Sequence, residues 1–325
     1  MYTKLSDVQL KTGEMMEIGV VLSPDREYAD GIMDLLSHKD DHWKWHIEKA
    51  LKGEITGLET RFYIGQLDGQ IIANVMTVEY DRTGFFGHVY TRPEHRRKHA
   101  CTSVMEQQME DFRQRGGGIM FLGTGYNSAA YWIYHSHGFR SLMEKSGFMR
   151  YSSEEDFEAS HFTPGEVRII DVDWKHWSML SVLASVPGIE SLRSVVFRVY
   201  GSEDFGEIFP EFMQSLVAGR IKVKLLESES GAVVGCAILA SDDRWRGKTY
   251  ILDIFAHPNF VSHYETLLNA LQLPEGKIQC YVDANAPGEK IAALQQADFN
   301  REARIEKQFE WENDWIDVFI YSKFS

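Results

Sequence analysis

The chain lacks the features that define several large classes of protein. Only three of its 325 residues are cysteines, Cys101, Cys236 and Cys280, and they form no CxxC pair. This pattern excludes a disulfide framework and a cysteine-rich zinc site, and it is typical of the reducing cytoplasm. The sequence has no run of about 20 apolar residues that would span a bilayer, and its first residues form no apolar signal segment. We therefore expect a cytoplasmic protein that does not insert into a membrane.

An excess of positive charge is also missing. The formal net charge is −14. Residues 1–150 carry 18 Lys or Arg against 20 Asp or Glu, whereas residues 151–325 carry 16 against 28. Nucleic acid is not an expected partner, because binding to its phosphates needs a basic face. The acidic excess either keeps the protein soluble or attracts cationic amines to a cleft, and we favour the first interpretation because charge counts do not locate charges.

What the chain does have is length and an alternation of strand-like and helix-like segments. At 325 residues it exceeds the size at which one hydrophobic core usually stops growing, so we predict two domains. Residues 1–150 form the first and residues 164–325 the second, joined by a polar linker at residues 151–163. The order of elements in the first part returns in the second, where Pro258 takes the place of Pro93. The predicted fold class is α/β (α+β) with a duplicated unit.

Local signals predict three elements of the first part. Ile and Val residues within Glu14–Leu22 favour a strand. Asp68-Gly69 between two further β-rich runs predicts a hairpin turn. Apolar residues at helical spacing predict a long helix that follows Pro93, reaches about Arg115 and ends at Gly116-Gly117-Gly118.

A basic turn leads into this long helix, with Arg92, Arg96, Arg97 and Lys98 around Pro93. The first N–H groups of a helix have no partner within the helix and carry the positive end of its dipole. Such a turn is suited to bind an anion, and a pyrophosphate is the natural ligand. The alternative is that the four cations are simply solvated at the helix start.

From this turn onward the chain resembles the GNAT-type N-acetyltransferases. The family motif Pro-Glu-His-Arg, any residue, Lys, Gly, any residue, Gly or Ala corresponds to residues 93–101, with His99 and Cys101 where the family commonly has glycine. A second motif follows further along the chain with all its members in place: Asn127, Ala130, Ile133, Tyr134, Gly138 and Phe139. The resemblance covers most of residues 14–150 and, more weakly, the second half. It implies two tandem GNAT-like domains, each a mixed, mostly antiparallel sheet flanked by helices.

The resemblance also implies an activity: transfer of the acetyl group of acetyl-CoA to a primary amine, without a metal. The strand before the turn would pair with the pantetheine arm, the turn would hold the pyrophosphate, and the second motif would place the arm. The residues given these roles are Val89, Tyr90 and Thr91 in the strand, Arg96, Arg97, Lys98, His99, Ala100, Cys101 and Thr102 in the turn, and Asn127, Ala130 and Tyr134 in the second motif. Tyr134 is further expected to donate a proton to the departing thiolate, although a core aromatic residue is its alternative role. The acceptor is expected to be a small-molecule amine.

The reaction also needs a proton acceptor, because an amine is protonated near neutral pH. Glu79, Asp81 and His88 are candidates, since each lies on or beside a strand expected to border the acceptor cleft. His88 has the side chain that titrates nearest neutrality. A chain of water molecules is the alternative to all three.

The segment 40–46 is rich in aromatic and titratable residues. Trp43 and Trp45 would hold a cationic acceptor by stacking and charge. The alternative, which we favour, is that an aspartate caps a helix here and the tryptophans pack. His42 and His46 share a helix face as metal ligands can, but the HExxH motif is absent.

The second half lacks the residues that would make it a second active site. Val261 stands at the position of Arg96, and Leu294 stands at the position of Tyr134. We therefore expect an inactive copy, for which three roles stay open: completing the substrate cleft, continuing a sheet between copies, or forming a homodimer. For the whole chain the main alternative is a non-catalytic acyl-CoA-binding or sensing protein. A structural or interaction protein that binds no CoA is the third hypothesis.

Overall fold

The computed structural model describes residues 1–325 and contains two compact units. The first comprises Met1–Phe157 with Trp174–Met179, and the second comprises Glu158–Asp173 with Leu180–Ser325. No local signal in the sequence predicts that Trp174–Met179 packs with the first unit. The residues expected to form a linker, 151–163, include the end of a strand and helix α5 (Phe157–His161).

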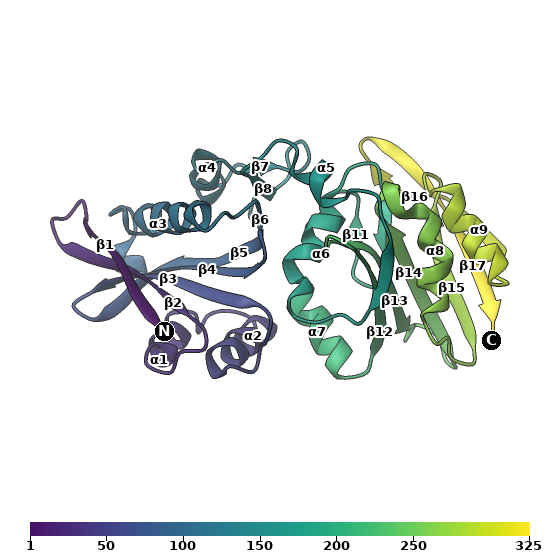
Figure 1. Ribbon diagram of the computed structural model, residues 1–325, viewed down its shortest axis with the longest axis horizontal. Coiled ribbons are helices and arrows are strands. Elements are labelled where there is room, and N and C mark those ends of the chain that lie inside the picture. Colours follow the sequence, from purple (N-terminus) through teal and green to yellow (C-terminus); the bar gives the residue numbers. More distant parts are fainter. The chain divides into compact units, whose positions relative to one another are not determined.

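The first unit is built on an eight-stranded sheet of order β1-β2-β3-β4-β5-β6-β8-β7 (Figure 1). Every neighbouring pair is antiparallel except β5 and β6, which run parallel. Helix α3 covers one face of the sheet, and α1 and α2 cover the other (Figure 1). The elements are β1 (Tyr2–Gln9), β2 (Met15–Leu22), α1 (Ala29–Leu35), α2 (Asp41–Lys52), β3 (Glu59–Leu67), β4 (Gln70–Tyr80), β5 (Thr83–Thr91), the 3-10 turn η1 (Pro93–His95), α3 (Ala100–Gln114), β6 (Ile119–Gly123), α4 (Ala129–Ser136), β7 (Arg140–Ser141) and β8 (Phe148–Ser152).

The predicted local elements of this unit are confirmed. The predicted strand is β2, and the hairpin turns at Asp68 and Gly69, whose φ angles of 48° and 79° are left-handed as a tight two-residue turn requires. The long helix is α3, and Gly116 follows it with φ 79°. Strand β1 was not predicted, because its residues are mostly polar and only partly buried.

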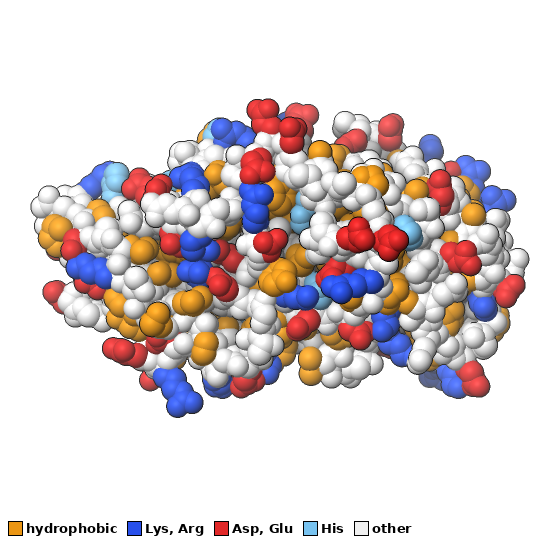
Figure 2. Space-filling model, in the orientation of Figure 1, with side chains coloured by type: hydrophobic (Ala, Val, Ile, Leu, Met, Phe, Trp, Pro, Cys, Tyr) orange, Lys and Arg blue, Asp and Glu red, His pale blue; other side chains and the backbone are white.

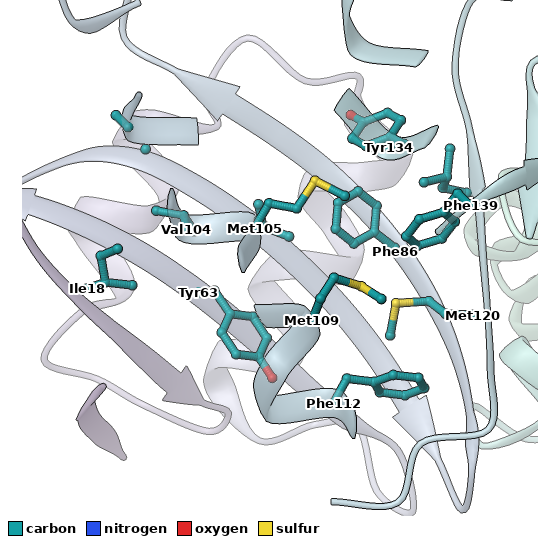
Figure 3. Close-up of a cluster of buried hydrophobic side chains, with 14 of the residues drawn as sticks. Ile18, Tyr63, Phe86, Val104, Met105, Met109, Phe112, Met120, Tyr134 and Phe139 are labelled. Carbon is teal, nitrogen blue, oxygen red and sulfur yellow. The ribbon is translucent and has the colours of Figure 1, made fainter. Parts of the chain in front are cut away.

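The core of the first unit fixes α3 against the sheet. Met105, Met109 and Phe112 of α3 lie in one buried cluster with Tyr63 of β3 and Phe86 of β5 (Figure 3). Full burial of each such side chain contributes about 1.5–3 kcal/mol. The start of α3 is thereby held beside the end of β5.

The second unit repeats this topology. Its seven strands are ordered β16-β17-β15-β14-β13-β12-β9, and only β14 and β15 are parallel. Read from β9, this is the order β2-β3-β4-β5-β6-β8-β7 of the first unit, so the predicted duplication is confirmed at the level of the fold. The elements are β9 (Val167–Ile170), α6 (His176–Ser185), β10 (Leu192–Ser194), β11 (Val199–Tyr200), α7 (Phe209–Val217), β12 (Ile221–Ser228), β13 (Val233–Ser241), β14 (Thr249–Ala256), η2 (Pro258–His263), α8 (Tyr264–Asn269), β15 (Lys277–Asp283), α9 (Gly288–Gln296), β16 (Asn300–Trp311) and β17 (Asp314–Phe324).

The exterior carries charges of both signs. On the face seen in Figure 2, acidic and basic side chains are interspersed rather than gathered into one field. None of the helices combines the length and the apolar character that crossing a membrane requires.

Candidate functional site

The two parallel strands of the first unit separate soon after they begin. They pair only from Thr83 with Ile119 to Phe85 with Phe121. Beyond Phe85, strand β5 runs on to Thr91 with β4 on one side and no strand on the other. Backbone N–H and C=O groups along that free edge are available to a ligand, as at any unpaired strand edge.

A bulge in β5 reorients this free segment. The pairing with β4 shifts register between Asn74 and Met76, and His88 takes a left-handed φ of 50°. The side-chain amide of Asn74 donates a 2.9 Å hydrogen bond to the His88 carbonyl oxygen and stabilises the bulge. Bulges of this kind are common beside functional sites, where they redirect side chains.

The turn after β5 presents a row of unpartnered backbone amides. Arg97 and His99 have φ angles of 59° and 76°, and helix α3 starts at the next residue, Ala100. Ser103 is the first residue whose N–H donates into the helix, to the His99 carbonyl at 3.0 Å. The N–H groups of residues 97–102 make no hydrogen bond within the protein. Successive amides around left-handed residues form a concave anion site, and the helix dipole reinforces it.

These amides border a cavity of about 340 Å³. Its walls contain seven of the residues predicted to bind the coenzyme, and they also contain Lys11, His95 and Ile133. The seven are Thr91, Arg96, Arg97, His99, Ala100, Cys101 and Thr102. The predicted Val89, Tyr90, Lys98, Asn127, Ala130 and Tyr134 do not line it.

The left-handed turn explains why glycine would suit position 99. A residue other than glycine is strained in this region because its Cβ approaches the backbone. His99 therefore keeps the N–H available to a ligand but places a Cβ and an imidazole at the cavity wall. At Cys101, burial raises the pKa of the thiol, so this side chain stays protonated at neutral pH.

Tyr134 lies at the edge of the hydrophobic cluster, beside Phe86 and Met105 (Figure 3). Its ring makes an edge contact with Phe86 at 5.4 Å between centroids. Its hydroxyl has no hydrogen-bond partner in the protein, and burial, helped by the nearby Cys101, raises the pKa of this phenol. Tyr134 does not itself line the cavity, but the preceding residue Ile133 and the nearby Cys101 both do.

Asn127 lies on the surface, at the approach to helix α4. It has φ 58°, and its Oδ1 accepts a 2.8 Å hydrogen bond from the Trp132 indole N–H. Ser128, which the sequence analysis did not single out, is the N-cap: its Oγ accepts from the Tyr131 N–H at 3.1 Å. The left-handed Asn127 and this cap together set where α4 begins.

The three base candidates occupy different surroundings. Glu79 is buried, and both of its oxygens are engaged by the Arg115 guanidinium, at 2.6 and 3.1 Å, while the Thr77 hydroxyl donates to Oε1 at 2.6 Å. Asp81 lies in the exposed β4–β5 turn. Position 79 is six residues along β4 from the partner of Thr91, which is about 20 Å in a strand.

His88 is the candidate on the bulge itself. Burial and four nearby titratable side chains lower the pKa of His88 well below its usual value, so the imidazole is neutral. These four are Lys39, His46, His42 and His38. Its Nε2 is buried without a hydrogen-bond partner, and the ring packs edge-on against Trp43 at 4.5 Å.

The aromatic segment of α2 packs rather than lining a cavity. Trp43 stacks on Trp177 at 6.1 Å, and His46 lies against Trp174 and Trp177 at 5.6 and 4.7 Å. His46 is fully buried, and its burial lowers the pKa to about 3. The packing part of the interpretation therefore fits the structure, with partners from Trp174–Met179 that no local pattern in the sequence could reveal. Asp40 stands at the N-cap position of α2, but its side chain makes no capping hydrogen bond, so the expected aspartate cap is not formed.

Comparison with known proteins gives one family. Residues 29–139 match the acetyltransferase (GNAT) family. This match covers about a third of the chain and lies within the first unit. No curated protein matches the chain.

Several solved structures resemble half of the chain at low sequence identity. A phosphinothricin acetyltransferase from Sinorhizobium meliloti in complex with AcCoA is 14% identical, with a TM-score of 0.39 over 49% of this chain and 88% of that one. An acetyltransferase from Salmonella typhimurium with acetyl-CoA is 14% identical, with a TM-score of 0.41 over 49% of this chain and 94% of that one. An acetyltransferase from Acinetobacter baylyi is also 14% identical, with a TM-score of 0.40 over 50% and 94%.

In the second unit, the opening that corresponds to the one in the first unit is filled by the chain itself. Strands β14 and β15 pair from Thr249 to Leu252 and then separate. Asp253 accepts hydrogen bonds from the Ser194 hydroxyl and from the N–H groups of residues 195 and 196, and Asp283 accepts from the Leu192 N–H. We call Leu192–Val196 the plug segment. This segment occupies the position that corresponds to a ligand bound along the free edge of β5 in the first unit.

Proposed function

We propose that the first unit transfers the acetyl group of acetyl-CoA to the primary amine of a small molecule. The observation that carries this proposal is the row of six unpartnered amides, residues 97–102, beside the free edge of β5. All of these residues except Lys98 line one cavity. Ala100 is buried and Lys98, Cys101 and Thr102 are half-buried, whereas Arg97 and His99 are exposed. A buried or half-buried N–H without a partner is costly, so the amides of residues 98 and 100–102 favour an anionic ligand. The pyrophosphate of a coenzyme supplies the acceptor oxygens.

The free edge of β5 supports the placement of the coenzyme arm. In this proposal the backbone of Val89, Tyr90 and Thr91 pairs with the amide groups of pantetheine, as an added strand would. Arg96 stabilises this end of the strand, because its guanidinium donates to the Thr91 carbonyl at 3.0 Å and lies over the Tyr90 ring. Asn127, with Ala130, would border the arm from the side of α4.

Tyr134 is the proposed proton donor to the leaving thiolate. Its raised pKa keeps the phenol protonated at neutral pH, and its hydroxyl is not committed to another group. A protonated donor near the sulfur lowers the barrier to departure of the thiolate, which typically raises the rate by a factor of about 10²–10⁴.

His88 is the proposed proton acceptor for the amine, through water. Its imidazole is neutral, and Nε2 has no partner in the protein. The strongly lowered pKa makes it a weak base, so the role is relay of a proton rather than storage. Glu79 is not proposed for this role, because Arg115 and Thr77 occupy its oxygens.

The test is acetyl-CoA turnover, measured as free thiol release with a panel of polyamines, amino acids and aminoglycosides. We expect release with at least one amine, and we expect Tyr134→Phe to lower kcat about 10²-fold while the Kd for CoA stays within twofold. Tyr126→Phe, which alters an exposed tyrosine, is the matched control. CoA binding without turnover on any amine would instead support the non-catalytic acyl-CoA-binding protein, and no CoA binding would refute both.

A further inference from the structure

The cavity has one wall that the GNAT-matched residues do not provide. Lys11, in the turn between β1 and β2, lines the cavity together with Arg97 and His99. It lies outside the family match, which begins at residue 29. The turn between β1 and β2 thus reaches the anion site from a part of the chain that precedes the family match.

The turn that carries Lys11 is held rigidly. The Leu10 N–H donates to the Glu14 carbonyl and the Gly13 N–H donates to the Leu10 carbonyl, both at 2.9 Å, and Gly13 has a left-handed φ of 97°. The Leu10 side chain is buried in the main cluster of the unit. The fold therefore fixes where the backbone of Lys11 lies in space.

The same turn is tied to the row of free amides. The Lys11 N–H donates to the Lys98 carbonyl at 3.2 Å. A peptide group is planar and trans, so fixing the Lys98 carbonyl directs the His99 N–H, in the same peptide plane, to the opposite side. The turn thereby helps to orient an amide that the ligand would use.

The ammonium group of Lys11 has no counter-ion in the protein. The other lysine of this hairpin, Lys4, is paired with Asp7 and Glu17, but no carboxylate lies within 4.0 Å of Lys11. An exposed cation beside a cavity edged with N–H groups makes the local electrostatic potential more positive, and anions are therefore attracted to it. Its flexible stem lets the ammonium reach a phosphate as a point charge.

We propose that Lys11 is a coenzyme-binding residue, contributing a phosphate contact from outside the residues that match the GNAT family. This inference rests on the proposed function, because it assigns a further ligand of the same site. The phosphate is either the pyrophosphate or the 3′-phosphate of CoA. The two are separated by using CoA and dephospho-CoA, which lacks the 3′-phosphate.

The experiment is calorimetric titration of the full chain with both ligands. We expect Lys11→Ala to weaken CoA binding about three- to tenfold and Lys11→Glu to weaken it further, with Lys11→Arg within twofold of wild type. Lys52→Ala, which removes an exposed lysine at the end of α2, is the matched control for net charge. The loss should shrink in 0.5 M NaCl, because salt screens an exposed charge.

The two ligands then identify the contact. A loss seen with CoA but not with dephospho-CoA assigns Lys11 to the 3′-phosphate, and an equal loss with both assigns it to the pyrophosphate. Equal affinities of Lys11→Ala and Lys52→Ala for both ligands would overturn the inference and leave the proposed function standing. If wild-type protein binds neither ligand, the proposed function itself fails.

Discussion

Replacing His99 with glycine and with alanine measures the backbone strain at the candidate anion site. Both substitutions remove the imidazole, and only glycine removes the Cβ. With φ 76°, position 99 costs a side-chain-bearing residue about 1–2 kcal/mol. A glycine at this position avoids that strain energy, but it lowers the free energy of unfolding by about 0.4–1 kcal/mol because glycine makes the unfolded chain more flexible.

The expected net result is that His99→Gly is more stable than His99→Ala by about 0.5–1 kcal/mol, from the difference of these two contributions. For a unit of this size, each kcal/mol of added stability raises the melting temperature by about 2–4 °C. Thermal and urea unfolding measure it directly. CoA should stabilise the glycine variant at least as well as the alanine variant, since the N–H groups are retained.

Glu106 supplies a control in the same helix. It is exposed within α3, where the backbone is helical, so Glu106→Gly should be less stable than Glu106→Ala by about 1 kcal/mol. The sign of the glycine–alanine difference must therefore reverse between the two positions. An alanine variant that is the more stable at both would refute the left-handed turn and, with it, the row of outward-facing amides.

Three further predictions address the rest of the molecule. Glu79→Ala should lower the free energy of unfolding by about 2–3 kcal/mol in urea titrations, because Arg115 loses its buried partner; kcat per folded molecule should be unchanged, and a large loss of kcat would restore Glu79 as a base. The pKa of His46 is about 3 in the folded protein and about 6.5 in the unfolded chain. As the pH falls from 7 to 5, the unfolded chain binds a proton at His46 and the folded protein does not, so the free energy of unfolding should fall by about 2 kcal/mol. His46→Leu should lack this part of the pH dependence, and identical slopes for the two proteins would contradict the burial of a neutral imidazole. Calorimetry should find one CoA site per chain, because the plug segment fills the second opening; two sites would refute that assignment.

Much of this arrangement follows from local sequence signals. The Asp68-Gly69 turn, the glycines after α3 and the apolar spacing within it are all short-range patterns, and the structure has the elements that they predict. The basic turn was also recognisable, since an anion site at a helix start depends on residues adjacent in sequence. Six of its predicted members line one cavity, together with Thr91 of the preceding strand.

What was missed depends on contacts between distant segments. Lys11 reaches the cavity only because β1 pairs with β2, and Trp177 packs on Trp43 across more than a hundred residues of chain. The engagement of Glu79 by Arg115 is likewise long-range, so a carboxylate that looked available from its strand position is committed in the fold. Periodicity reports which face of an element is buried but not which segment covers it.

The two units share a topology that leaves part of a strand edge unpaired, and they differ in what lies along that edge. Wherever parallel strands separate, an edge of backbone N–H and C=O groups is left that must find partners. In the second unit the plug segment occupies this place, held there by the side-chain carboxylates of Asp253 and Asp283. In the first unit the corresponding edge, from Phe86 to Thr91, has no such segment, and the free amides of the following turn lie at its end.

Removing the plug segment would therefore not create a second site. The second unit has Val261 in place of Arg96, and its helix α8 follows His263, whose φ of −100° is not left-handed. Without a left-handed turn, the amides before the helix do not converge on a common point. An open second edge would thus expose apolar and backbone groups without an anion site, and the expected consequence of such a deletion is loss of stability rather than gain of coenzyme binding.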